Sequence, residues 1–350
     1  MITYIGPATN KIEIEKSLKL AFKVFKKNNK KINYKNKIDL WKIDSNIKLK
    51  NLIIIKNKND VIGLTRIIPR KLKLNNKIFN ISGLSSICID KKYRSKGLSK
   101  ILINYVLEYC KRNKYDLAIL FARNFLNHYY NKYGIYGISH YTSLNFKSSD
   151  LLNFSNKKYL IKKAKVSDLK KIKKSYEYTY LKCNGIFYRE YSFWKYLFNK
   201  NNLEKNKIEV LIKDKKFYGY IIRNNNHIYE IGILPITDLN ILLRTIKLNY
   251  QTIELDMIQN HPILKNIDKI DFTFKFRQCP YGGHMLKIIN THKLVKYSKV
   301  KLNNNDLTKI KKNKIDQKLT MKLLQIIDFS NFPKSHFNFN YFSFLNSDHL

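Results

Sequence analysis

The chain has 350 residues, 44% of them hydrophobic, so it is long and apolar enough for two or three folded domains and is not wholly disordered. No run of about 18 apolar residues occurs, which excludes a conventional membrane-spanning helix, and the N-terminus lacks the layout of a signal peptide. Four scattered cysteines without metal-ligand spacing favour a reduced, cytoplasmic protein with no metal site.

The formal net charge of +43 comes mainly from lysine, because 59 lysines stand beside only 9 arginines. Proteins that read nucleic acids rely on the flat, bidentate guanidinium group of arginine. The lysines also occur everywhere, together with many asparagines and isoleucines, which is typical of a general residue bias. We therefore expect no specific nucleic-acid partner, although the charge should speed the capture of anionic ligands.

In the first half of the chain, apolar periodicity predicts an alternation of helices and strands. A helix over 10–27 precedes a hairpin of two strands, 51–56 and 61–69, and a third strand over 77–90. The next elements are a helix from Leu98 to about Asn113, a strand over 115–122, and a short helix, glycine stop and strand over 127–139.

The stretch YRSKGLSKIL, which begins at Tyr93, links the third strand to the following helix. The first backbone N–H groups of a helix have no partner within the helix, and the helix dipole makes this end positive. A glycine at Gly97 lets an anion approach the backbone closely, and Arg94, Lys96 and Lys100 add charge. The sequence therefore predicts a phosphate site here, with a plain strand-to-helix turn as the alternative.

This region resembles the GNAT superfamily of acyl-CoA-dependent N-acyltransferases. The family signature Arg/Gln-x-x-Gly-x-Gly/Ala reads Arg94-Ser-Lys-Gly97-Leu-Ser99 here, with serine in place of the last small residue. A strand precedes the signature, and a helix and another strand follow it. The element Tyr130-Asn-Lys-Tyr-Gly134-Ile then matches the family's Tyr-x-x-x-Gly-aromatic pattern, except for the final isoleucine.

The resemblance implies a role for each matching residue, with acetyl-CoA as co-substrate. The backbone of Ile87, Cys88 and Ile89 would pair with the pantetheine arm. The pyrophosphate would be held by the loop residues Arg94, Ser95, Lys96, Gly97, Leu98, Ser99 and Lys100. Because the family's amine attacks the thioester directly, Cys88 is expected to be a buried strand residue and not a nucleophile.

The resemblance also implies that Tyr130 is the general acid. A phenol with an ordinary pKa near 10 keeps its proton at neutral pH and can donate it to the departing CoA thiolate. The alternative is that Tyr130 is one of 25 tyrosines that pack the core, and the adjacent Tyr129 and Tyr133 are the other candidates for the role.

After a polar linker over 147–158, the second half repeats this organisation. Helices over 164–182 and around REYSFWKYLF precede three strands within 207–234, a helix over 236–248, and further strands at TIELDM and DFTFKF. The counterpart of the phosphate loop reads PITDLN, from Pro235 to Asn240. It has no glycine and carries an acid, so the second unit is expected to keep the fold without the cofactor site.

Two tandem units of this kind resemble the acetyltransferases related to the enhanced-intracellular-survival protein. The expected fold is α/β, with mixed, mostly antiparallel sheets in a catalytic domain (1–148) and a degenerate second domain (158–298). The remainder (299–350) is too short for that subfamily's third domain and is expected to be a helical and aromatic tail, with a helix near 315–328. The resemblance also implies that the C-terminal carboxylate of Leu350 acts as general base, with Asp348 and His349 as alternatives.

The sequence thus predicts an acetyl-CoA-dependent N-acetyltransferase that modifies a primary amine of a small molecule, such as an amino sugar. Acetylation of a protein or a polyamine is an alternative reaction. A basic RNA-associated binding protein on the same scaffold is the alternative from another class. Relatives of this kind often form homo-oligomers, and no membrane span is expected.

Overall fold

The computed structural model describes most of the chain. The described residues are 2–25, 48–138, 140–150, 156–203, 206–257, 261–264, 273–278, 283–298 and 300–324. Within them, no helix combines the length and the apolar character that crossing a membrane requires.

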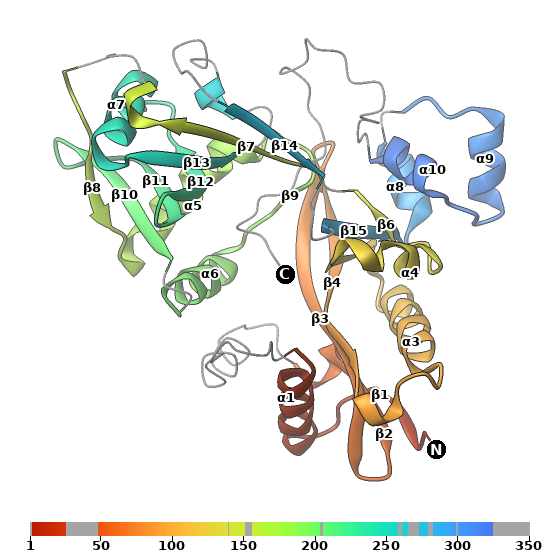
Figure 1. Ribbon diagram of the computed structural model, residues 1–350. Helices are drawn as coiled ribbons and strands as arrows, with labels where there is room; N and C mark the ends of the chain where they lie inside the picture. The colour runs from red at the N-terminus through yellow and green to blue at the C-terminus, as the bar shows by residue number, and fades with distance from the viewer. Residues whose placement is uncertain are drawn as a thin grey trace.

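The first half of the chain follows the predicted order of elements (Figure 1). Its strands are β1 (Tyr4–Pro7), β2 (Leu52–Asn57), β3 (Asp60–Leu74), β4 (Lys77–Ile89), β5 (Leu117–Ala122), β6 (Tyr136–Gly137) and β7 (His140–Lys147). Its α-helices are α1 (Lys11–Phe25), α3 (Leu98–Arg112) and α4 (Asn127–Asn131).

The second half repeats the pattern, as expected. Its strands are β8 (Leu160–Lys163), β9 (Ile186–Phe187), β10 (Lys207–Lys213), β11 (Lys216–Asn224), β12 (His227–Ile233), β13 (Thr252–Met257), β14 (Thr273–Gln278) and β15 (Gly283–Ile288). Its helices are α5 (Leu169–Tyr180), α6 (Tyr191–Leu203), α7 (Leu239–Asn249), α8 (Thr291–Tyr297), α9 (Asn304–Lys311) and α10 (Gln317–Leu323).

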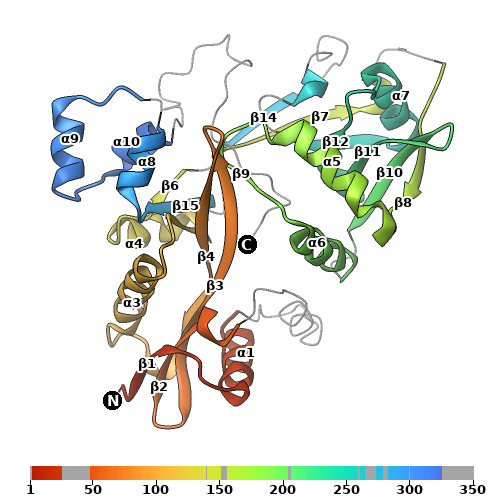
Figure 2. The ribbon, with the colours of Figure 1, turned by 180° about the vertical axis from the view of Figure 1, so that it is seen from behind.

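The first sheet has the strand order β1-β2-β3-β4-β5-β15-β6, with β9 added beside β3. Alternate residues of β2 face opposite sides, as strand geometry requires. Ile53 and Ile55 pack with α3, whereas Leu52 and Ile54 pack with α1. Figures 1 and 2 accordingly show α1 and α3 on opposite faces of the long β3–β4 hairpin.

The second sheet has the strand order β14-β7-β13-β12-β11-β10-β8. One face of it packs against α5 and the other against α7, through Tyr176 and Ile246 among others. Among the described strands, each sheet contains one parallel pair, β4–β5 in the first and β12–β13 in the second. The expectation of mixed, mostly antiparallel sheets is therefore confirmed.

The two sheets exchange strands. β7 precedes the linker in the sequence but pairs with β13 and β14 of the second sheet. Conversely, β15 comes from the second half and lies between β5 and β6 of the first sheet. The predicted boundaries at 148 and 158 do not reflect this exchange, since a linear division cannot represent it. The division into domains stays a prediction, and part of the linker lies outside the described residues.

Contacts from β3 to β9 and to the start of α6 join the two lobes. Leu72 pairs with Phe187 of β9, and the guanidinium of Arg70 lies 4.2 Å from the ring centre of Phe193. Lys71 forms an ion pair of 2.7 Å with Glu190. One apolar cluster contains residues of both lobes and of α10, so the sheets share part of their core.

Candidate active site

The parallel strands β4 and β5 separate at one end. They pair over four positions, from Ile81 opposite Leu117 to Leu84 opposite Leu120. β4 then continues for five residues, to Ile89, without pairing with β5. The backbone edge of β4 from Ser85 to Ile89 therefore faces a gap, and an extended ligand can pair with such an edge as another strand would. Ile87, Cys88 and Ile89 all lie on this segment.

A β-bulge interrupts β4 where the two strands part. Ser86 and Ile87 together face Thr65 of β3, and the pairing resumes at Cys88. Ser86 has a φ of 57°, in the left-handed region, and Thr65 donates a hydrogen bond of 3.2 Å to the Ser85 carbonyl. A bulge turns backbone groups away from the regular ladder and often lies beside an active site. Sequence reasoning missed it; the small, polar pair Ser85-Ser86 within an apolar strand is a weak signal.

The loop from β4 to α3 leads through Gly97 directly into the first turn of α3. Gly97 caps α3 with a φ of 73°, and its carbonyl accepts from the N–H groups of Lys100 and Ile101 at 3.0 and 3.2 Å. A Cβ at this glycine would have no atom within 4 Å, so the space in front of it is open. Ser95 is also left-handed, with a φ of 62°. The N–H groups of the first turn, including those of Leu98 and Ser99, have no acceptor within the helix.

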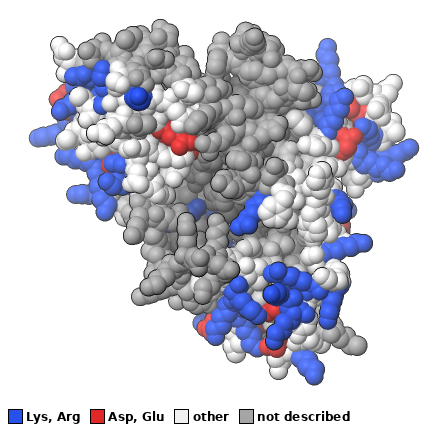
Figure 3. Space-filling model, in the orientation of Figure 1, with Lys and Arg blue, Asp and Glu red and all other residues white. Residues whose placement is uncertain are grey.

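Basic side chains surround this loop. Arg94, Lys96 and Lys100 are exposed, as are Lys91 and Lys92. Figure 3 shows lysine and arginine side chains gathered at the lower end of the molecule, where Figure 1 places β1, β2 and the start of α3. The positive end of the helix dipole and these charges together favour an anionic ligand.

The Arg94 side chain also has a structural role, because its Nε donates to the Ile89 carbonyl at 3.2 Å. This bond ties the loop to the end of β4. The one acid in the loop, Asp90, pairs with Lys23 of α1 at 2.9 Å, and this partner lowers the pKa of the Asp90 carboxyl. The carboxylate therefore offsets little of the positive potential of the loop.

Tyr130 lies on α4, just beyond the end of β5. It is 8% exposed and belongs to the same apolar cluster as Leu98 and Ala122. Its ring packs edge-on against Tyr129, with 5.3 Å between ring centres. Burial raises the pKa of Tyr130 to about 12, so the phenol keeps its proton at neutral pH. After the helix, Gly134 turns the chain with a φ of 68°.

Cys88 is buried, and burial raises the pKa of its thiol to about 12. A thiol with so high a pKa is a poor nucleophile at neutral pH because the thiolate is the reactive form. This agrees with its expected role as a packed strand residue. The other predicted catalytic group, the carboxylate of Leu350, lies outside the described residues, as do Asp348 and His349.

Comparison with known families identifies the first lobe. Residues 7–139 match the family of the acetyltransferase (GNAT) domain. This segment is therefore a GNAT-type domain. The matched segment contains the β4–β5 gap, the bulge, the glycine loop and Tyr130.

Several solved structures have the same fold across both lobes of this chain. A "Probable N-Acyltransferase" of Enterococcus faecalis V583 aligns with a TM-score of 0.66 at 15% identity, over 84% of this chain and 74% of its own. Eis1 from Mycobacterium abscessus aligns with a TM-score of 0.61 at 11% identity, over 84% and 76%. The N-myristoyltransferase of Saccharomyces cerevisiae, with bound myristoyl-CoA, gives 0.51 at 12% identity, over 81% and 77%.

A sequence relative comes from Amsacta moorei entomopoxvirus. It is 28% identical to this chain over 215 residues, which are 57% of this chain and 70% of the relative. It is provisionally named a glycylpeptide N-tetradecanoyltransferase.

In the second lobe, the equivalent helix start is capped by a side chain of the chain itself. The side chain of Asp238 caps α7 and accepts from the N–H groups of Asn240 and Ile241 at 2.8 and 3.2 Å. A carboxylate of the chain itself therefore occupies the position that a phosphate would take. The acid in PITDLN is thus a helix cap.

The edge of β12, the counterpart of β4, is also occupied by side chains. Tyr180 of α5 hydrogen-bonds both the carbonyl and the N–H group of Ile231, at 2.6 and 3.2 Å. Thr179 does the same for Ile233, at 3.2 and 2.8 Å. The buried His261 contacts the Ile231 carbonyl at 2.8 Å through Nε2. These backbone groups already have partners and offer little to a pantetheine arm.

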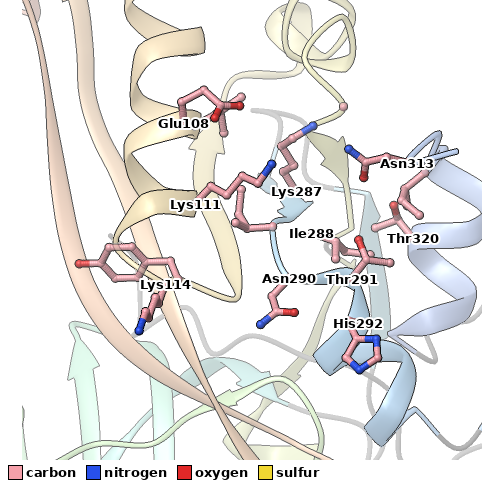
Figure 4. A pocket seen from close by; sticks show the side chains of 15 residues that line it. Glu108, Lys111, Lys114, Lys287, Ile288, Asn290, Thr291, His292, Asn313 and Thr320 are labelled. Carbon is pink, nitrogen blue, oxygen red and sulfur yellow. The ribbon is translucent and has the colours of Figure 1, made fainter. Parts of the chain in front are cut away.

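A cavity of about 590 Å³ lies at the other end of α3 (Figure 4). Lys111, Lys287 and Asn290 line it, together with residues of the α9–α10 region. Lys111 lies 14 residues after Gly97, and at 1.5 Å per residue this places the cavity roughly 20 Å from the glycine loop. The cavity is therefore separate from the glycine loop proposed for the pyrophosphate.

Proposed function

We propose that this chain is an acyl-CoA-dependent N-acyltransferase whose first lobe binds the donor. One observation carries the proposal. The open backbone edge of β4 leads directly to a helix start at which a left-handed glycine faces open space among exposed basic residues. A strand edge suits the amide groups of pantetheine, and the helix start suits its pyrophosphate.

The proposed reaction is a direct attack of a primary amine on the thioester. The amine nitrogen forms a bond to the carbonyl carbon, the carbon–sulfur bond breaks, and the thiolate takes a proton from Tyr130. The raised pKa of Tyr130 supports this role, because the phenol is protonated at neutral pH. Backbone N–H groups of the Ser86 bulge are the proposed donors to the developing oxyanion.

The amine must also lose a proton. We propose the C-terminal carboxylate of Leu350 as the acceptor, as the resemblance to the tandem family implied. The second lobe is proposed to bind no acyl-CoA, because Asp238, Thr179 and Tyr180 occupy the equivalent backbone groups. Its role would then be to shape the acceptor side of the site.

Two acyl donors are candidates. The family description and the sequence both support acetyl-CoA, with a small amine such as an amino sugar as acceptor. The poxvirus relative supports a tetradecanoyl donor with an N-terminal glycine of a peptide as acceptor. We favour the second, because 28% identity over 215 residues is a closer relation than the 11–15% identity of the structural neighbours.

The test is a thiol-release assay with acetyl-CoA and tetradecanoyl-CoA against a panel of amines. The panel contains an amino sugar, a polyamine, a peptide with a free N-terminal glycine and the same peptide with that amine blocked. We expect release with the free peptide and tetradecanoyl-CoA, and none with the blocked one. Release only with acetyl-CoA and the amino sugar would establish the first candidate. No release by any pair, together with a salt-dependent gel shift of RNA at physiological ionic strength, would favour the RNA-binding alternative.

A further inference from the structure

Three side chains of metal-ligand type lie together on one face of the second sheet, far in sequence from the GNAT motifs. His227 lies at the start of β12, and Glu254 and Asp256 lie on β13. The Nε2 atom of His227 is 2.8 Å from a carboxylate oxygen of Asp256, and Nδ1 is 3.9 Å from Glu254. One ligand atom from each of the three lies within 4.8 Å of the others.

The pairing register explains this grouping. In the parallel pair β12–β13, His227 lies beside Glu254 and Ile228 lies beside Leu255. Ile228 and Leu255 are buried on the face that packs against α7, so their neighbours point to the opposite face. The imidazole ring packs on Tyr229, with 4.3 Å between ring centres, which fixes its position.

The exchanged strand β7 adds a second, independent observation. Ser143 lies directly opposite Asp256 in the antiparallel pair β13–β7, so both side chains project from the same face. Ser143 is only 5% exposed, and its Oγ is buried without a hydrogen-bond partner among the described residues. A buried hydroxyl without a partner is costly, and its position beside the carboxylates indicates a missing ligand.

Asn145 is opposite Glu254 in the same register, and its Nδ2 is likewise buried without a partner in the described part of the chain. Amide groups are common beside hard cations, because their oxygens are ligands for such ions. The polar set therefore spans three adjacent strands, β12, β13 and β7.

We propose that His227, Glu254 and Asp256 bind a divalent metal ion, with Ser143 as an additional oxygen ligand. One imidazole nitrogen and two carboxylate oxygens form a donor set suited to Zn²⁺ or Mn²⁺. Around a tetrahedral ion, donors with bonds of about 2.1 Å lie about 3.4 Å apart. A side-chain rotation that moves one ligand atom by about 1.4 Å brings the present atoms, which lie within 4.8 Å of one another, to that spacing.

The site is accessible to an ion. The side chains of His227 and Glu254 are 29% and 31% exposed, whereas that of Asp256 is 11% exposed. The two outer ligands can therefore exchange with solvent above a buried floor of Asp256 and Ser143. A bound ion would tie the exchanged strand β7 to β12 and β13 and so fix the strand exchange between the lobes.

The experiment is calorimetric titration of the full chain with Mn²⁺ and with Zn²⁺ after treatment with a chelator, together with Mn²⁺ EPR. We expect one saturable site per chain, and a melting temperature that rises with the ion. Asp256→Asn and His227→Gln should each weaken binding by at least about 10-fold. Asp214→Asn, which removes an exposed acid in the β10–β11 turn of the same sheet, is the matched control and should leave binding unchanged.

Melting curves in chelator show whether each variant is folded before it is titrated, and the use of two variants protects against the loss of one. Lys275 of β14 occupies the register position on the other side of Ser143. If basic groups of the protein, and not a metal ion, balance the charge of the two carboxylates, neither ion will bind the wild-type chain. Absence of saturable binding, or equal affinity in Asp256→Asn and the wild type, would overturn the proposal.

Discussion

Replacing Gly97 by alanine should have two effects that can be measured separately, one on the stability of the fold and one on the affinity for CoA. The new Cβ would meet no protein atom within 4 Å, so it disturbs no packing. What remains is the left-handed conformation at a φ of 73°, which costs a residue with a side chain about 1–2 kcal/mol. We expect Gly97→Ala to lower the free energy of unfolding by that amount and the melting temperature by a few degrees.

The same Cβ projects into the space proposed for the pyrophosphate. We therefore expect the affinity for CoA, measured by calorimetry, to fall at least tenfold, which corresponds to about 1.4 kcal/mol. Gly185→Ala is the control, because Gly185 also has a positive φ, 82°, but lies beside Lys73 at the opposite end of the β3–β4 hairpin from the glycine loop. It should lose stability and keep CoA affinity. Unchanged CoA affinity in folded Gly97→Ala would refute the view that the bare backbone accepts the pyrophosphate.

Four further predictions follow from the site and the core. Tyr130→Phe should lower kcat at least tenfold with nearly unchanged acyl-CoA affinity, and the pKa of about 12 predicts no loss of the phenol proton between pH 7 and pH 10 in the wild-type pH profile. Cys88→Ala should retain most of the turnover in the thiol-release assay, because in the proposed reaction the amine, and not this thiol, attacks the thioester. Deletion of the last three residues should abolish turnover while the melting curve remains cooperative. Glu230→Gln breaks a fully buried bidentate pair with Arg189 (both bonds 2.8 Å) and should cost about 3–5 kcal/mol in urea unfolding, whereas Glu190→Gln in the exposed pair with Lys71 should cost less than about 1 kcal/mol.

The strand, loop and helix around Gly97 could be predicted from the sequence because their determinants are local. Gly97 is one of only 11 glycines, basic residues flank it, and an apolar strand and an amphipathic helix adjoin it. The expectation that the second lobe has no cofactor site rests on equally local features, the missing glycine and the acid of PITDLN. The structure adds the physical cause, which is that Asp238 itself occupies the helix start.

Features that depend on pairing between distant segments were not predicted. The short strand β15 has an apolar pattern that fits either sheet, so the sequence alone does not assign it to the first. The bulge at Ser86 depends on the register with β3, and the grouping of His227 with Glu254 depends on the parallel pairing of β12 with β13. Residues 27 positions apart show no metal-ligand spacing, so such a site becomes visible only in the folded chain.

The central claim is that only the first lobe holds the CoA donor. A calorimetric titration of the full chain with CoA tests it most directly, because CoA occupies the site without a reaction. We expect one site per chain, lost or weakened at least tenfold in Gly97→Ala and unchanged in Asp238→Ala. Two sites per chain in the wild type, or a single site weakened by Asp238→Ala and not by Gly97→Ala, would contradict it.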